Sequence, residues 1–542
     1  MTDDASGLLL AHADDRSPAL AATVPLVTTR KQAPAKLPDP DNLADYHNHP
    51  NDLGVQRWAV IAPEGPAGDA LLAQVAPLIA AREAQQGAKA HRFRVPPGLN
   101  ADEASRWKRT VYHASERSTK LLPRYQLILG DLDQVSYDVQ VAQAVEGFVG
   151  RLAFDRPADY AAYCDKLLAA ERAPRTRTRA LFHSVRDGTA ATDLGRKALV
   201  RPCVELAREL RAGAVDDFPA EPLESGGDEP DPDEFIDLVR DPGVLLSLSH
   251  GVGAPRGGWK TPAAQRAGQG AMSFGRDAEA LRGQALALAP CLPGGLWFMF
   301  ACFGAGTPAT SKYLKWLRVL ADAGEAPGSL DAVLASLPPA GSPPFVAALP
   351  KAVLANPRGP LAFIGHHDLA WSYSFREVDL GRTLLQTARF VDVVTAAVTG
   401  DRVGVAFDKL FRWFASINTD LATLDDSDGA DPLRRARMWM LRQDLAGFML
   451  LGDPAARVVT PAPAPAAARA PVDLANFFGG MTVLPPTVET LPTIERLESA
   501  FAQLLTGTAT TTRLAAELGL SAARLDELFK KYRAAGRAAI KP

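Results

Sequence analysis

Short runs of apolar residues, separated by amphipathic stretches, recur along the chain between about residues 57 and 458. Near the start, strands are predicted at 57–62, 91–95 and 125–129, and a helical pattern at 101–115 lies between the last two. Strands that alternate with helices are typical of a parallel sheet. The pattern therefore predicts an N-terminal α/β unit over residues 55–155.

A second α/β unit is predicted over residues 156–458. Its first part, 156–215, has a mainly helical pattern. Three apolar runs follow at 244–248, 296–300 and 360–365. They are too short for helices and do not alternate with polar residues, which is typical of buried parallel strands.

Two of these runs end in reactive side chains. His250 and Gly251 follow the first run, and Ala301 and Cys302 follow the second. In an open α/β sheet the ligand crevice lies at the carboxyl ends of the strands. Neighbouring strands would therefore place an imidazole and a thiol together in that crevice.

Three segments flank or follow the α/β units. Residues 1–54 are rich in Ala, Asp, Pro and His without clear periodicity, and we expect a partly disordered leader. Residues 459–472 form a Pro/Ala linker, for which an extended, semi-rigid chain is typical. Residues 473–542 are predicted to be a small helical module, in which 512–529 resembles a helix-turn-helix.

Composition narrows the classes of function. The chain has 542 residues, a net charge of −3 and a pI of about 6.3, so it lacks the overall positive charge that is typical of nucleic-acid-binding proteins. No apolar run approaches the length of a membrane span, and the acidic N-terminus does not read as a secretory signal. Four cysteines are too few for a disulfide framework in this length. We therefore expect a cytoplasmic protein, in which a free thiol is available as a nucleophile.

The chemistry predicted for this pair is nucleophilic catalysis without a cofactor. A thiol with a pKa near ~8.5 needs a neighbouring base to supply thiolate, and His250 would take the proton from Cys302 and return it to a leaving amine. The backbone N–H groups of Gly251 and Cys302 are the candidate oxyanion-hole donors. The small residues at 304–306 suggest a strand-to-helix turn that keeps the sulfur exposed. A single buried cysteine is usually inert, but the joint pattern favours catalysis.

The two strand ends resemble the signature of the caspase-like cysteine peptidases, which include caspases, gingipains and the bacterial CHAT proteases. Cys302 lies 52 residues after His250, near the roughly 50 quoted for caspases. Further segments resemble the gingipain branch in sequence order: Gly130-Asp131 after a strand, Gly150-Arg151 with Lys166 and Glu171, and Leu451-Gly452-Asp453-Pro454. The resemblance implies two α/β subdomains with parallel sheets flanked by helices, and chemistry in the second.

The resemblance also suggests a substrate pocket. Asp368 and Trp371 follow the third strand, where the family builds part of the pocket for P1, the residue whose carbonyl is attacked. Asp368 would select a basic P1 residue by charge pairing, although a solvated loop aspartate explains it equally well. His366 and His367 lack Cys or His partners at ligand spacing, so no metal site is predicted.

The third member of a catalytic triad is not identified by the sequence. An acidic stretch precedes the strand that leads to His250, and an exposed loop is the preferred interpretation over a role in orienting the imidazole. Its acidic residues are Asp231, Asp233 and Glu234.

The function predicted is a cysteine endopeptidase that acts on a protein or peptide substrate. The lack of a signal peptide and the helical tail favour a regulated bacterial enzyme in a stress or defence pathway, with an operon-encoded target. The alternatives are a catalytically silent scaffold of the same fold and a regulator that binds DNA or protein through the C-terminal helices. For those helices a protein partner is favoured over nucleic acid, because only the far end is strongly basic. No membrane partner is expected.

Overall fold

The computed structural model describes most of the chain. The described residues are 5–25, 49–116, 121–173, 177–213, 223–226, 231–276, 278–324, 330–379, 382–425, 431–459, 500–501, 511–518, 525 and 529. The chain divides into two units, 1–462 and 463–542, which are treated separately.

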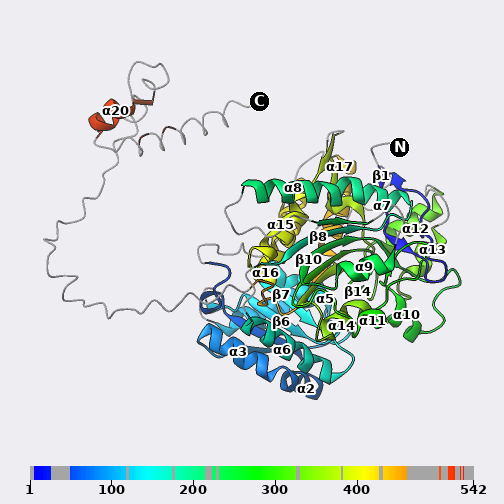
Figure 1. The fold of residues 1–542 in the computed structure, drawn as a ribbon, viewed down its shortest axis with the longest axis horizontal. Coiled ribbons are helices and arrows are strands. Elements are labelled where there is room, and N and C mark those ends of the chain that lie inside the picture. The colour runs from blue at the N-terminus through cyan, green and yellow to red at the C-terminus, as the bar shows by residue number, and fades with distance from the viewer. Residues whose placement is uncertain are drawn as a thin grey trace. The chain divides into compact units, whose positions relative to one another are not determined.

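A ten-stranded sheet forms the core of the first unit (Figure 1). Its strand order is β5-β4-β6-β7-β19-β16-β13-β10-β8-β9. One half contains β4 (Trp58–Pro63), β5 (His91–Val95), β6 (Tyr125–Leu129) and β7 (Phe148–Leu152). The other half contains β8 (Arg179–Ser184), β9 (Leu223–Ser225), β10 (Gly243–Leu248), β13 (Leu296–Phe300), β16 (Ala362–His366) and β19 (Phe448–Gly452).

All neighbouring strands of this sheet are parallel except β16 and β19. Because β19 is antiparallel to β16 and parallel to β7, the strands β4 to β7 run opposite to β8, β10, β13 and β16. The predicted α/β class, with parallel strands flanked by helices, is confirmed. The two predicted sheets are halves of one continuous sheet, and the boundaries 55–155 and 156–458 stay predictions.

Helices pack against both halves of the sheet. Every residue of β4, β6, β10, β13, β16 and β19 is buried, so both faces are covered. The helices of the first half are α1 (Leu53–Gln56), α2 (Pro66–Gln74), α3 (Ala76–Gln86), α4 (Ala101–Trp107), a π-helix (Lys108–Tyr112), a 3-10 turn (His113–Ser115) and α5 (Tyr137–Ala144).

The other described helices of the first unit follow β7 in the sequence. They are α6 (Pro157–Arg172), α7 (Ala190–Gly195), a π-helix (Arg196–Val200), α8 (Arg201–Gly213), α9 (Pro232–Leu238), α10 (Pro262–Gly268), α11 (Gly283–Leu286), α12 (Leu314–Asp322), α13 (Asp331–Ser336), α14 (Ala348–Ala355), a 3-10 turn (Ser372–Ser374), α15 (Ala388–Val398), α16 (Val403–Asp425) and α17 (Pro432–Ala446). Several begin at a proline, whose fixed φ and missing N–H suit the first helical turn.

Four small sheets complete the first unit. They pair β1 (Ala5–Ser6) with β3 (Val24–Pro25), β14 (Gly306–Thr307) with β15 (Phe345–Val346), and β17 (Arg376–Asp379) with β18 (Arg382–Leu385). The fourth has the order β12 (Met272–Ser273), β11 (His250–Val252) and β2 (Leu10–Ala11). Residues 5–25 of the predicted leader therefore have defined places in the fold.

The helical interpretation of residues 156–215 is wrong in its middle. After α6, the chain forms β8, a fully parallel neighbour of β10. The apolar part of β8 is only Ala180–Phe182, which is too short to stand out among helical patterns. This strand matters because the segment after it reaches His250.

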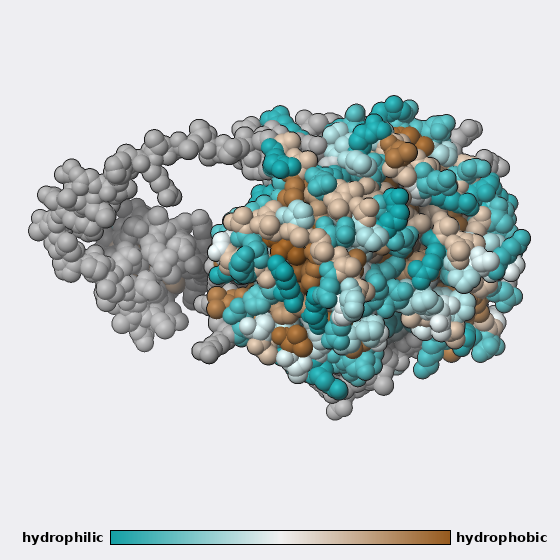
Figure 2. Space-filling view, turned by 90° about the horizontal axis from the view of Figure 1, so that it is seen from below, coloured by the Kyte–Doolittle hydropathy of each residue, from teal (hydrophilic) through white to brown (hydrophobic). Residues whose placement is uncertain are grey.

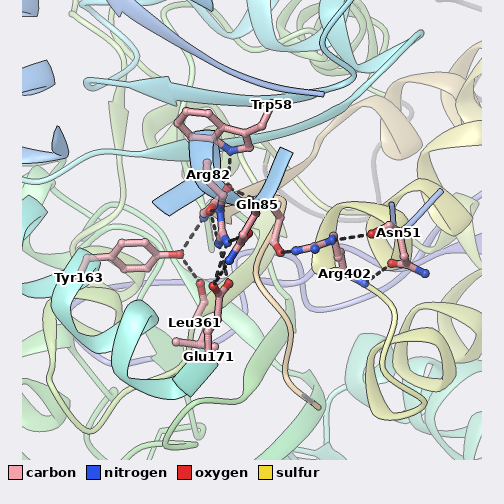
Figure 3. A network of polar contacts seen from close by, with 10 residues as sticks. Asn51, Trp58, Arg82, Gln85, Tyr163, Glu171, Leu361 and Arg402 are labelled. Atoms are coloured by element: carbon pink, nitrogen blue, oxygen red, sulfur yellow. Dashed lines mark hydrogen bonds and ion pairs between the residues drawn. The ribbon is translucent and has the colours of Figure 1, made fainter. Parts of the chain in front are cut away.

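A buried ionic network ties the sheet halves together (Figure 3). Arg82 on α3 lies 2.7 Å from Asp453 and 2.6 Å from Glu171. Asp453 Oδ1 also accepts a hydrogen bond from Trp58 Nε1 at 3.0 Å, and its backbone N–H donates to the Tyr163 hydroxyl at 2.7 Å. Glu171 and Asp453, both part of the gingipain-like pattern, thus hold β19 to the helices α3 and α6.

The other residues of that pattern are also structural in this fold. Buried Arg151 donates to the carbonyl oxygen of Gly130, and Asp131 pairs with Lys351 at 2.7 Å. Lys166 Nζ donates to two backbone carbonyls, and burial lowers the pKa of this lysine to about 7. These contacts fix strand ends and helices against one another.

The surface of the first unit is mixed in character. Hydrophilic and neutral residues cover most of the face seen in Figure 2, and the strongly hydrophobic residues form small separate patches. Among the described residues, no helix is long and apolar enough to cross a membrane.

The second unit is described only in part. Its helix α20 (Thr511–Leu518) packs with Ala500, Phe501 and Leu525 in a small apolar cluster. This helix coincides with the first predicted helix of 512–529, while the turn at 519–524 and the linker beyond residue 459 lie outside the described residues.

Candidate active site at the ends of two parallel strands

The structure brings His250 and Cys302 to neighbouring strand ends. β10 and β13 are parallel, with Leu248 opposite Phe300 in the register. His250 and Cys302 each follow two residues later, so they lie at the same level beyond the sheet. Both residues are completely buried.

The imidazole of His250 is oriented by a segment that the sequence did not reveal. Its Nε2 lies 2.9 Å from the hydroxyl of Thr189, which donates its own proton to Asp187 Oδ1 at 2.9 Å. Asp187 Oδ2 lies 3.7 Å from the same ring nitrogen. Because the Thr189 proton is committed to Asp187, this network assigns the imidazole proton to Nε2.

The other ring nitrogen, Nδ1, is thereby left as the basic one. It is buried and has no hydrogen-bond partner among the described residues. An unprotonated imidazole nitrogen is what a general base requires. Asp187 and Thr189 follow β8, and the signal that could have found them is a short apolar run followed by an aspartate.

Burial sets the protonation of both reactive groups. It lowers the pKa of His250, an effect that the nearby charge of Asp187 opposes. It raises the pKa of the Cys302 thiol well above its usual value, although the backbone N–H of Ala370 donates to the sulfur at 3.2 Å. In this closed arrangement both groups are therefore neutral.

Two backbone N–H groups converge on one carbonyl oxygen beside the thiol. The amide of Gly251 donates to Leu9 O at 2.7 Å, and the amide of Cys302 donates to the same oxygen at 3.1 Å. These are the two predicted oxyanion-hole donors, and paired amides aimed at one carbonyl oxygen have the geometry of such a hole. The oxygen that they hold belongs to the leader.

The thiol is not exposed, contrary to the expectation for the turn after it. Leu10 pairs with Gly251 in the three-stranded sheet, and the carbonyl of the preceding residue, Leu9, accepts the hydrogen bond from the Cys302 amide. No helix follows directly either. Phe303 turns the chain with a positive φ of 56°, β14 follows, and the next helix is α12. A non-glycine residue in this region costs about 1–3 kcal/mol, and such residues cluster at functional sites.

The two predicted pocket residues lie in different surroundings. The Asp368 carboxylate accepts backbone hydrogen bonds from Lys312 and Leu369 at 2.9 and 2.8 Å, and burial raises its pKa to about 6. It lines a cavity of about 540 Å³, and none of the described residues 5–25 is among those that line this cavity. Trp371, in contrast, is paired with Leu8 of the leader through a backbone bridge.

The remaining candidates have structural contacts. Both ring nitrogens of His366 face backbone carbonyls, and His367 Nδ1 lies 3.1 Å from Gly447 O. Within the part of the chain that the structure describes, no group of three or more His, Cys, Asp or Glu residues could hold a metal ion. Asp231 accepts from the Asp233 amide and caps α9, and Glu234 accepts from a serine hydroxyl.

Comparison with known proteins gives distant structural similarities. No family model matches the chain, and no curated protein matches it. The crystal structure of gingipain R, an Arg-specific cysteine proteinase, is similar with 13% identity and a TM-score of 0.45, over 78% of this chain and 83% of that chain. A second structure, described only as a protease, is similar with 11% identity and a TM-score of 0.42, over 75% and 79%.

Proposed function

We propose that this protein is a cysteine endopeptidase of the caspase-like clan, with Cys302 as nucleophile and His250 as general base and acid. One observation carries the proposal: the amides of Gly251 and Cys302 converge on a peptide carbonyl oxygen beside a thiol and an imidazole. A substrate carbonyl in the place of the Leu9 carbonyl would meet the same donors.

The reaction then follows from the atoms present. Cys302 Sγ attacks the carbonyl carbon while His250 Nδ1 accepts the thiol proton, and the two amides stabilise the negative oxygen. His250 next gives the proton to the leaving amine, which breaks the peptide bond and leaves a thioester on Cys302. Water hydrolyses the thioester, which releases the acid and restores the thiol.

Asp187 and Thr189 are positioning residues in this scheme. They keep the imidazole proton on Nε2, so that Nδ1 is free to take the thiol proton. The negative charge of Asp187 also stabilises the imidazolium that forms during the reaction.

The cellular setting remains a prediction. Four free and buried cysteines, all in the described part of the chain, agree with a reducing cytoplasm. A role in a bacterial stress or defence pathway, an operon-encoded target and a protein partner for the C-terminal helices rest on the sequence resemblance and composition.

Peptide-library digestion tests the activity. Because the Leu9 carbonyl occupies the two amides of the site, Leu9→Asp serves as the parent chain. The parent and its Cys302→Ala and Cys291→Ala forms are incubated with the same library, and products are identified by mass spectrometry. Cys291 is an equally buried free cysteine that makes none of the contacts described for the site, which makes it the matched control. We expect cleavage by the parent and by its Cys291→Ala form, and none by its Cys302→Ala form. Equal cleavage by all three would refute the proposal.

A further inference from the structure

We propose that residues 5–11 occupy the active site in the orientation of a substrate, with Leu9 as the P1 residue, and that the site stays closed until this segment leaves. This inference rests on the proposed function and deepens it. It names the substrate class as extended peptide segments with leucine or a similar apolar side chain at P1.

The backbone of the segment is held as a substrate backbone would be. The carbonyl of Leu9 accepts from both predicted oxyanion-hole amides, and its N–H points to Ala370 O at 3.5 Å. One residue earlier, Leu8 forms an antiparallel bridge with Trp371. An added strand at an exposed sheet edge is a general mode of peptide recognition, in which main-chain hydrogen bonds supply affinity.

The bridge continues toward the N-terminus of the segment. The backbone N–H of Gly7 donates to Ser372 Oγ at 3.3 Å, and Ser6 Oγ lies 2.9 Å from the same hydroxyl. Together with Leu8 and Leu9, these residues form an extended stretch along 370–372. The bond between Leu9 and Leu10 therefore lies where the scissile bond of a substrate would lie.

The side chains indicate an apolar preference. Leu8, Leu9 and Leu10 are only 2%, 2% and 0% exposed. The Asp368 carboxylate, for which pairing with a basic P1 side chain was one of two predictions, accepts hydrogen bonds from two backbone amides. The structure thus offers apolar burial at the P1 position, which favours leucine over arginine.

The segment is also anchored on the leaving-group side. Beyond Ala11 the chain turns and returns, so that Ala19 N–H donates to Leu10 O at 2.8 Å. Arg256 fastens the turn through Asp15 at 3.1 Å and Ser17 at 3.0 Å. These contacts would retain the amine side of the Leu9–Leu10 bond and so favour a closed site over a released product.

The ordinary explanation is that a core strand satisfies two buried amides, as every buried backbone requires. The two explanations differ in what happens when the segment is displaced. If the segment is a structural strand, its displacement should unfold the protein. If it is a bound substrate mimic, its displacement should leave a folded protein with an open site.

The test is site-resolved alkylation of the full-length chain with iodoacetamide. Leu9→Asp places a charge in the buried P1 position and alters none of His250, Gly251 or Cys302. Ala21→Asp adds the same charge to an exposed leader residue and is the matched control. We expect Cys302 to react at least tenfold faster in Leu9→Asp than in wild type, and at the wild-type rate in Ala21→Asp.

The three other buried cysteines report on folding in the same spectrum. Cys164, Cys203 and Cys291 should stay unmodified if the variant is folded. If Leu9→Asp exposes them, Leu9→Ala, which only removes apolar contact, replaces it under the same criterion. The closure is overturned if Cys302 reacts as fast in wild type as in Leu9→Asp. It is also overturned if all four cysteines react alike in Leu9→Ala.

Peptide probes test the substrate class. The variant that exposes Cys302, Leu9→Asp or its replacement Leu9→Ala, is called the opened variant. It is treated with Gly-Leu-Leu and Gly-Leu-Arg acyloxymethyl ketones, and we expect the leucine probe to modify Cys302 at least tenfold faster than the arginine probe does. Faster modification by the arginine probe overturns the apolar preference.

The two proposals fail in distinguishable ways. If iodoacetamide modifies Cys302 in the opened variant while neither ketone reacts and no peptide is cut, the peptidase and the substrate class are refuted and the closure stands. If wild-type Cys302 is freely modified and peptides are cut, the closure is refuted and the peptidase stands.

Discussion

Gly251 faces the backbone of Cys302 so closely that a methyl group has no room. A Cβ atom at 251 would lie 2.8 Å from the carbonyl carbon and 3.0 Å from the amide nitrogen of Cys302, with the carbonyl oxygen closer still. These are backbone atoms, which cannot rotate away as a side chain does. Gly251→Ala therefore forces the ends of β10 and β13 apart.

The expected cost is about 3 kcal/mol or more, at the upper end of the roughly 1–3 kcal/mol typical of overpacking. Restriction of the unfolded chain returns about 0.4–1 kcal/mol, which leaves a net destabilisation of about 2 kcal/mol. Gly304→Ala is the matched control, because its Cβ would meet nothing nearer than 3.4 Å. We expect that variant to stay within about 0.5 kcal/mol of wild type.

Urea denaturation followed by tryptophan fluorescence measures both variants. The same samples are tested for Cys302 alkylation, which should be faster in Gly251→Ala because the separated amides no longer hold the leader. Equal midpoints and equal alkylation rates for the two alanine variants would refute the close approach of the two strand ends.

Three further outcomes follow from the buried charges. In the Leu9→Asp background, Asp187→Asn removes the charge that raises the His250 pKa, so the acidic limb of the kcat/KM profile should move to lower pH and kcat should fall tenfold or more; an unchanged profile would contradict the positioning role. Asp453→Ala should cost about 3 kcal/mol in urea denaturation because it removes one of the two carboxylates that pair with buried Arg82 and leaves Trp58 Nε1 without its acceptor, whereas Lys89→Ala, at an exposed pair, should cost under about 0.5 kcal/mol; similar costs would argue against the network. Burial raises the pKa of Asp444 to about 7, so the stability that its protonated form contributes is complete below about pH 4 and is lost as the pH rises to 7. Over that range the unfolding free energy of wild type should fall by on the order of a few kcal/mol more than that of Asp444→Asn. Parallel curves for the two proteins would refute the raised pKa.

Much of the fold was predictable because buried parallel strands have a strong local signature. The runs at 244–248, 296–300 and 360–365 became β10, β13 and β16, since uninterrupted apolar residues are needed where both faces of a sheet are covered. β8 was not predicted because its apolar part is short. Because β8 was not predicted, Asp187 and Thr189, which follow it and contact His250, were not predicted either.

The position of residues 5–11 could not be predicted from the sequence. These residues have no periodicity of their own, because several of them are held by groups far away in the sequence. Gly7 meets the Ser372 hydroxyl, and Leu9 meets the amides of Gly251 and Cys302. The role of Asp368 in a P1 pocket stays a prediction. The spacing after β16 indicated that Asp368 is near the site, but the direction of its carboxylate depends on the amides of 312 and 369.

The distance in sequence between the leader and its binding surface has a consequence for biosynthesis. Gly7 and Ser372, which are joined by a hydrogen bond, are 365 residues apart. At about 5–20 residues per second, a ribosome needs roughly 20–70 s to make the second partner after the first. Residues 5–11 are therefore synthesised long before the residues that bind them, and their three consecutive leucines, Leu8 to Leu10, lack their binding surface until Ser372 has been made.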